Sequence, residues 1–185
     1  MPGIDISRPF IAVRIAVLTV SDSRGLAEDK SGQTLVDRLE AAGHTLADGQ
    51  IVRDEIADIQ KIVIQWLDDE NVDVVISTGG TGVTGRDITP EAFDALYEKE
   101  IPGFGELFRM LSYQKIGTST IQSRASAGVA RGTYLIALPG STGAVKDAWD
   151  DILVHQLDYR FMPCNFVELF DRLQEHEKRS KSSTN

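Results

Sequence analysis

A glycine-rich stretch in the middle of the chain contains the residues with the clearest potential for chemistry. In the segment VVISTGGTGVTGRDITPEAF (74–93), an apolar run gives way to closely spaced glycines, and the acidic residue Asp87 follows them. Glycines let the backbone approach an oxyanion closely, so that N–H groups can point at it. The stretch predicts an anion-binding loop formed by Gly79, Gly80, Thr81 and Gly82. A turn that merely reverses the chain is the simpler alternative.

This loop matches neither of two familiar nucleotide-binding motifs. A Walker loop closes with Gly-Lys-Ser/Thr, whereas Arg86 and Asp87 stand near the end of this stretch. The dinucleotide fingerprint follows the first strand of its unit, whereas this stretch follows the third predicted strand. The sequence therefore predicts phosphate binding by a different arrangement.

Two other loops carry polar groups at the ends of predicted strands. The segment TVSDSR brings hydroxyls and a carboxylate together, from Thr19, Ser21, Asp22 and Ser23. The segment LPGST places a tight turn, Pro139-Gly140, before Ser141 and Thr142, either of which can cap the helix that follows. An Asx turn in the first segment and a plain strand–turn–helix junction in the second are the alternatives.

Two acidic residues could hold a metal ion beside these loops. Asp54 ends a predicted strand and Asp87 ends the glycine stretch. We expect neighbouring parallel strands to bring both acids to one edge of the sheet. Carboxylates facing phosphates would repel them unless they bind Mg²⁺, which prefers few carboxylates together with phosphate oxygens and water. Each acid taken alone fits a helix cap or a solvated surface position.

The other metal-ligating and nucleophilic residue types show no useful spacing. The three histidines are scattered along the chain. We expect the single cysteine, Cys164, to be a packed thiol, because nothing near it in the sequence would activate it.

Apolar runs rich in β-branched residues predict the strands that would end at these loops. They are Arg14–Val20, a run from Thr45 to about Asp54, Val72–Ser77 and Gly132–Leu138. The third run is mainly apolar, which is typical of a strand covered on both faces in a parallel sheet.

Apolar residues at helical spacing predict helices between the strands. We expect Gly43 to end the first helix, and Thr89 to cap the helix that begins at Pro90. The stripes are Leu35, Leu39 and Ala42; Ile59, Ile62, Val63, Trp66 and Leu67; Phe104, Leu107, Phe108 and Leu111; and Val145, Ala148, Trp149, Ile152 and Leu153.

Alternation of strands and helices predicts an α/β fold, a three-layer α/β/α sandwich with a mostly parallel sheet. Ligands of such sheets bind beyond the carboxyl ends of the strands, where all the loops described above would lie. We expect one domain over residues 1–172, an N-terminal arm at 1–13, and a polar, disordered tail at 173–185.

Composition limits the classes of function. The net charge is −9 and the pI is about 4.8, which argues against nucleic-acid binding through clustered Lys and Arg. No stretch reaches the roughly 18 apolar residues of a membrane span. The single cysteine and the absence of a leader-type pattern fit a cytoplasmic protein.

Several motifs together resemble the MoaB/MogA family of molybdenum-cofactor biosynthesis proteins, which includes the G domain of gephyrin. The matching segments run in family order from about Ala16 to Thr142: AVLTVSDSR, EDKSGQ, VRDE, STGGTGVTGRDITPEA, GFGELFRMLS, Ser123-Arg124 and LPGST. The extended N-terminus and the ending DYRFMPCNF look more like the MoaB branch.

The resemblance implies the three-layer sandwich, molybdopterin as substrate, and transfer of AMP from Mg-ATP to the terminal phosphate of molybdopterin with release of pyrophosphate. Asp54 and Asp87 fall on the family's catalytic acidic positions and would hold the Mg²⁺. The glycine loop would hold nucleotide phosphates, and arginines would add positive charge. The remaining residues implied for cofactor binding are Thr19, Ser21, Asp22, Ser23, Arg86, Glu91, Ser123, Arg124, Pro139, Gly140 and Ser141.

Other functions remain open at this point. Members of the MoaB branch can lack one of the acids, and binding of the pterin without adenylylation is an activity open to that branch. This chain keeps both acids, which favours the adenylyltransferase, and a non-catalytic pterin-binding or carrier protein is the main alternative. An assembly module is a third, since the family forms trimers and the MoaB branch hexamers. We expect a hexamer, with a trimer as the alternative, and an N-terminal arm that packs on another subunit. A nicotinamide enzyme is a weaker fourth, because the first strand lacks the fingerprint.

Overall fold

A computed structural model describes residues 2–22 and 28–175 of the chain. Its main sheet has six strands in the order β3-β2-β4-β7-β6-β5. The strands, in that order, are Thr45–Val52, Arg14–Val20, Val74–Thr78, Thr133–Leu138, Ser126–Ala130 and Lys99–Glu100.

The first four strands in this spatial order run parallel, whereas β6 and β5 are antiparallel to their neighbours. The predicted mostly parallel sheet is thus confirmed, and the two antiparallel strands were not expected. The β6 segment SAGVA is short and made largely of small residues, so it lacks the β-branched signal that reveals the longer strands. Strand β3 ends at Val52, two residues before the expected Asp54.

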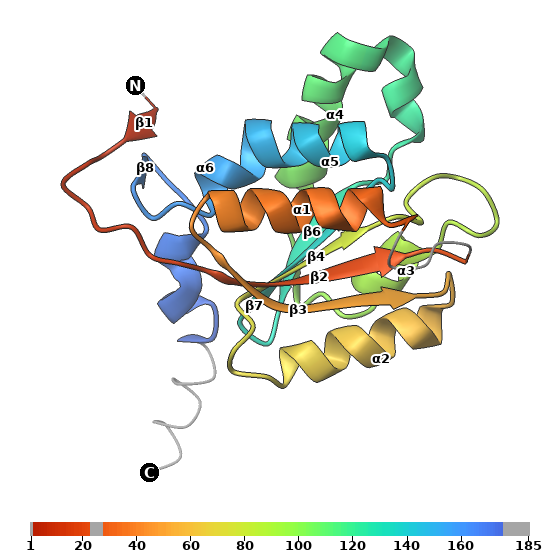
Figure 1. The fold of residues 1–185 in the computed structure, drawn as a ribbon, viewed down its shortest axis with the longest axis horizontal. Coiled ribbons are helices and arrows are strands. Elements are labelled where there is room, and N and C mark those ends of the chain that lie inside the picture. Colours follow the sequence, from red (N-terminus) through yellow and green to blue (C-terminus); the bar gives the residue numbers. More distant parts are fainter. Residues whose placement is uncertain (1, 23–27, 176–185) are drawn as a thin grey trace.

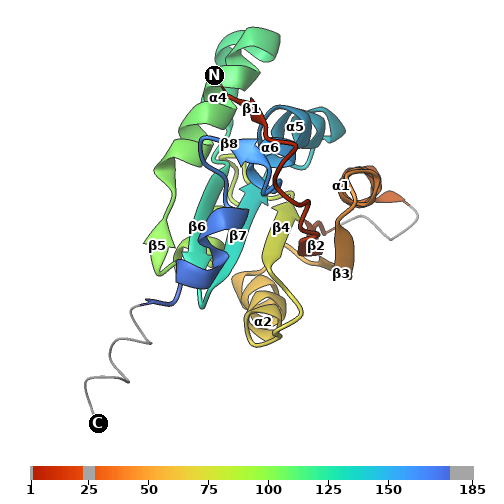
Figure 2. The same ribbon diagram turned by 90° about the vertical axis from the view of Figure 1, so that its left-hand side faces the viewer.

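Helices cover both faces of the sheet and complete the predicted three layers (Figures 1 and 2). Helices α1, α4 and α5 pack over one face and α2 and α3 over the other, each side with its own apolar core. Fully buried residues from successive positions of β4, such as Val75 and Ile76, join opposite cores, as expected for a strand covered on both faces. The helix bounds are α1 Lys30–Ala41, α2 Ile56–Leu67, α3 Thr89–Asp94, α4 Pro102–Ile116 and α5 Thr142–Ala148.

Short helical turns continue two of these helices. The 3₁₀ turn η2 (Gly117–Gln122) follows α4, and the two protrude together from the body of the molecule (Figure 1). The predicted stripe from Val145 to Leu153 spans α5 and a π-helical turn, η3 (Trp149–Leu153), and α6 (Val154–Gln156) follows directly.

Helix ends follow the sequence signals except at α3. Gly43 has a φ of 89° just beyond α1, a left-handed conformation that suits glycine at a helix end. Ser141 caps α5 by accepting a hydrogen bond from the Ala144 N–H at 3.2 Å. The prediction that Thr89 caps α3 is wrong: its hydroxyl donates to the Gly79 carbonyl at 2.9 Å and so ties α3 to the glycine loop instead.

The N-terminal segment packs on its own chain. Strand β1 (Gly3–Ile4) pairs antiparallel with β8 (Phe161–Met162), the guanidinium of Arg8 lies 3.8 Å from the ring centroid of Tyr159, and Phe10 contacts His44. These contacts hold residues 3–10 against the body of the protein.

The C-terminal segment ends with the 3₁₀ turn η4 (Val167–Arg172). Leu173 still packs against the core, and residues 176–185 of the predicted tail lie outside the described part. The expectation of a packed thiol is wrong, because Cys164 is exposed. It follows β8 in a surface turn that contains the cis Met162–Pro163 bond.

Over the described residues, no helix is long and apolar enough to cross a membrane.

Candidate functional site

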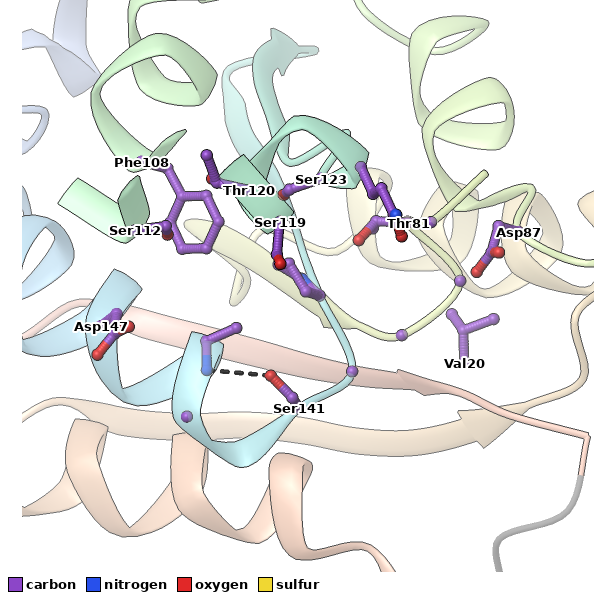
Figure 3. Close-up of a pocket in the computed structure, with 18 of the residues that line it drawn as sticks. Val20, Thr81, Asp87, Phe108, Ser112, Ser119, Thr120, Ser123, Ser141 and Asp147 are labelled. Atoms are coloured by element: carbon purple, nitrogen blue, oxygen red, sulfur yellow. Dashed lines mark hydrogen bonds between the residues drawn. The ribbon is translucent and has the colours of Figure 1, made fainter. Parts of the chain in front are cut away.

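A pocket of about 590 Å³ opens beyond the carboxyl ends of the parallel strands. Its floor is formed where β2, β4 and β7 end, at Val20, Gly79 and Pro139. Helix α4 and η2 form one wall, and the first residues of α5 form another (Figure 3). This is the edge of the sheet where the sequence predicted a ligand site.

The glycines of the central loop are required by close contacts with other parts of the floor. Gly79 has a φ of 109°, and a Cβ there would lie 2.2 Å from the carbonyl oxygen of Val20. A Cβ on Gly140 would lie 3.1 Å from the Gly79 Cα. The ends of β2, β4 and β7 are thus in backbone contact.

The same loop brings both predicted acids to the pocket. A Cβ on Gly80 would lie 3.1 Å from Oδ1 of Asp54, and a Cβ on Gly82 would lie 2.7 Å from Oδ2 of Asp87. Both acids line the pocket. The expectation that neighbouring strands bring the two acids together was wrong, because β2 lies between β3 and β4. The turn after β3 carries Asp54, and the long glycine loop carries Asp87, across the end of β2.

The two acids differ in their electrostatic surroundings. Burial raises the pKa of Asp54, and the nearby Asp22 and Asp87 carboxylates add to this. The pKa of Asp87 is lowered, although its partial burial opposes this, because its carboxylate accepts hydrogen bonds from the Thr84 N–H and hydroxyl at 2.8 and 2.6 Å. An acid held among like charges is the kind of group that a bound cation would stabilise.

Arg86 binds acidic residues beside the pocket. Its guanidinium donates to both carboxylate oxygens of Asp22, at distances of 2.6 to 2.9 Å, and to Glu55 at 3.0 Å. Asp22 in turn accepts a hydrogen bond from the Asp54 N–H at 3.2 Å. This network joins the loops that follow β2, β3 and β4.

Arg124 binds the glycine loop on the side away from the pocket. Its side chain donates to the carbonyl oxygens of Gly82 and Asp87 at 2.6 and 2.5 Å, and also pairs with Glu91. Arg124 and Glu91 line a separate hollow on that side of the loop.

Most of the predicted residues meet in the pocket. Asp54 and Asp87 are joined there by Ser21, Asp22, Gly79, Gly80, Thr81, Gly82, Ser123, Pro139, Gly140 and Ser141. Thr19, Arg86, Glu91 and Arg124 lie behind or beside it, and the Thr19 hydroxyl bonds Asp29. Ser23 lies outside the described residues.

Sequence reasoning missed the α4–η2 wall. Phe108, Ser112, Ser119 and Thr120 face the pocket across from Ser141 and Asp147 (Figure 3). Phe108 and Ser112 lie in the matching segment GFGELFRMLS, but the resemblance assigned them no role in the site, and no motif covers Ser119 and Thr120. The helical spacing of Phe104, Phe108 and Ser112 was a second signal, since it places them on the buried face of α4.

The acidic groups suit a metal shared with a ligand better than a metal held by protein alone. In the described ranges, no three His, Cys, Asp or Glu residues are grouped as a complete metal site. Two carboxylates beside the glycine backbone that lines the pocket fit Mg²⁺, which takes its remaining ligands from phosphates and water.

The fold and the pocket together define an α/β protein with a cavity beyond the carboxyl ends of its parallel strands, the place where sheets of this kind bind their ligands. The family model described as a probable molybdopterin binding domain matches residues 16–159. The chain belongs to the MoaB/MogA family of molybdenum-cofactor biosynthesis proteins.

Individual relatives agree with this assignment. The chain is 50% identical over 161 residues to molybdenum cofactor biosynthesis protein B of Escherichia coli K12, covering 87% of this chain and 95% of that protein. A crystal structure of a molybdenum cofactor biosynthesis protein B superposes with a TM-score of 0.82 at 40% identity, covering 91% and 99% of the two chains. The tungsten cofactor synthesizing protein MoaB from Pyrococcus furiosus gives 0.71 at 37% identity, covering 77% and 91%.

Proposed function

We propose that this protein binds molybdopterin and adenylylates its terminal phosphate with Mg-ATP. The observation that carries the proposal is the meeting of Asp54 and Asp87 beside the glycine backbone in one pocket. An oxygen of the molybdopterin phosphate forms a bond to the α-phosphorus of ATP. The bond from the α-phosphorus to the oxygen that bridges the α- and β-phosphorus atoms breaks, and pyrophosphate leaves with the electron pair of that bond.

Charge neutralisation and alignment are what such a transfer needs most. Mg²⁺, when bound, would neutralise charge on the phosphates, and Asp54 and Asp87 are the residues that would hold it. The backbone from Gly79 to Gly82 would bind nucleotide phosphates. Ser21, Asp22, Ser123 and the turn at Pro139–Ser141 would line the molybdopterin side.

A non-catalytic molybdopterin-binding or carrier protein is the second candidate. The surroundings of Arg86 and Arg124 favour this second candidate. Both arginines are bound to acidic groups or carbonyl oxygens of the protein itself, so neither is placed to neutralise the phosphates of ATP. The two candidates differ in a measurable product, since the carrier releases no pyrophosphate.

The deciding experiment measures pyrophosphate release by the purified protein with molybdopterin and ATP, with and without Mg²⁺. Release that requires all three supports the transferase. Tight pterin binding without release supports the carrier.

Asp87→Asn tests the assigned acid with little change in side-chain shape. We expect turnover to fall by at least about 100-fold, as when one preorganised electrostatic group is lost, while pterin binding persists. Asp68→Asn, on a surface ion pair with Arg131, is the control and should turn over normally. Unchanged turnover in Asp87→Asn would show that the role given to Asp87 is wrong.

We also propose that the protein acts in the cytoplasm as a hexamer, with a trimer as the alternative. Large exposed apolar side chains favour an assembly: Ile6 is 92% exposed, and Met110, Tyr113, Ile116 and Ile121 lie exposed on α4 and η2.

A further inference from the structure

Arg124 contacts the protein in a way that its expected role in ligand binding does not explain. Its side chain is about one-third exposed. Its guanidinium donates to the carbonyl oxygens of Gly82 and Asp87. These carbonyls stand at the two ends of the six-residue segment 82–87 (the 82–87 loop), so one side chain joins both ends.

The main chain adds a further link to the same loop. The N–H of Arg124 donates to the carbonyl of Thr81 at 3.0 Å, directly before the segment. Glu91 binds the third donor position of the guanidinium from the first turn of α3. The guanidinium is thereby fixed by three partners from the glycine loop and the helix that follows it.

Inside the 82–87 loop, the side chain of Asp87 depends on the shape of the loop. Its Oδ2 accepts hydrogen bonds from the N–H and the hydroxyl of Thr84, and the Asp87 N–H donates to the Thr84 carbonyl at 3.1 Å. A change in the path between Gly82 and Asp87 would therefore move this carboxylate.

We propose that Arg124 is a positioning residue: it fixes both ends of the 82–87 loop and so places the Asp87 carboxylate in the pocket, without binding substrate. This inference rests on the proposed adenylyl transfer for its kinetic consequences. A planar guanidinium can bond two separated carbonyls at once, whereas an ammonium is a point charge on a flexible stem. Arg124→Lys therefore keeps the charge and loses the bridge.

The kinetic test compares Arg124→Lys with the wild type across ATP and Mg²⁺ concentrations. We expect kcat to fall by about 10- to 100-fold, as for a displaced catalytic group, with the KM for ATP little changed and more Mg²⁺ needed for half-maximal rate. Glu91→Gln leaves the hydrogen bonds from Arg124 to the Gly82 and Asp87 carbonyls in place, so kcat should fall much less than in Arg124→Lys. A raised KM for ATP with kcat and the Mg²⁺ requirement unchanged would make Arg124 a phosphate ligand and overturn the proposal.

A second measurement does not depend on turnover. Hydrogen exchange at the Thr84 and Asp87 amides should accelerate in Arg124→Lys, while amides of β4 and β7 exchange as in the wild type. Arg131→Lys, which alters an arginine paired with Asp68, is the matched control. Unchanged exchange at Thr84 and Asp87 would overturn the positioning role. An inactive wild type with accelerated exchange in the variant would instead reject the adenylyl transfer and keep the loop assignment.

Discussion

At the scale of single residues, the protein contains a histidine whose surroundings favour its neutral form. His44 is buried among Phe10, Trp149 and the start of β2, and its Nδ1 accepts a hydrogen bond from the Val13 N–H at 3.1 Å. Burial lowers the pKa of His44, with a smaller opposing effect from Asp158. Protonation would both charge a buried ring and remove the acceptor.

This arrangement predicts acid sensitivity near neutral pH. The pKa of His44 is lower in the folded than in the unfolded state, so the unfolded chain binds the extra proton. The free energy of unfolding should be highest above about pH 6.5, the unfolded value, and fall as the pH drops toward the folded value. Urea unfolding at pH 7.5, 6.0 and 5.0 measures it.

His44→Asn is the companion variant, because its Oδ1 can accept the Val13 hydrogen bond without titrating. It should be less stable at pH 7.5 through lost ring packing, and its stability should depend less on pH between 7.5 and 5.0. An equally steep pH dependence in this variant would assign the effect to other groups.

At the scale of elements, the strands and loops that could be predicted from the sequence were those marked by a strong local pattern of residues. Strands β2, β4 and β7 are rich in apolar residues and are followed directly by Ser21, Gly79 and Pro139, so both the strands and the loops after them were predictable. Thr89 was assigned wrongly because a capping signal cannot show that the hydroxyl has a tertiary partner, here the Gly79 carbonyl. Ser119 and Thr120 reach the pocket from η2, where the sequence offers no motif, and Ser112 ends the matching segment GFGELFRMLS, which does not show by itself that this side chain faces a pocket.

The backbone contact at the pocket floor gives a prediction at this scale. Gly79→Ala adds a Cβ 2.2 Å from the Val20 carbonyl at a φ of 109°. We expect a loss of about 2–4 kcal/mol of stability from strain and overpacking, measured by urea unfolding. Gly49→Ala, where a Cβ meets nothing within 4 Å, is the control and should change stability little. Equal stability of the two variants would mean that the backbone around Gly79 shifts to accept a Cβ at little cost, and it would contradict the prediction.

At the scale of the whole molecule, α4 and η2 protrude from the body of the sandwich (Figure 1). The N-terminal arm is fixed to its own chain through β1, Arg8 and Phe10, whereas α4 and η2 present apolar side chains outward. These features bear on assembly more than on the stability of one chain.

Light scattering at micromolar concentration tests the proposed assembly. We expect the mass of six chains of 20.3 kDa, and a mass of three would support the alternative. Dilution and added salt serve as controls, since an assembly held by apolar contacts should resist moderate salt. A monomeric mass throughout would contradict the proposed assembly.

The floor and the wall of the pocket differ in how they can diverge during evolution. At the floor, the backbone of Gly79 packs closely against the Val20 carbonyl and against Gly140, so any larger residue at either glycine is opposed by steric overlap. The wall formed by α4 and η2 presents ordinary side chains, including Phe108, Ser112 and Thr120. Substitutions that change ligand preference are therefore expected on α4 and η2, whereas the residues of the floor are expected to change little among relatives.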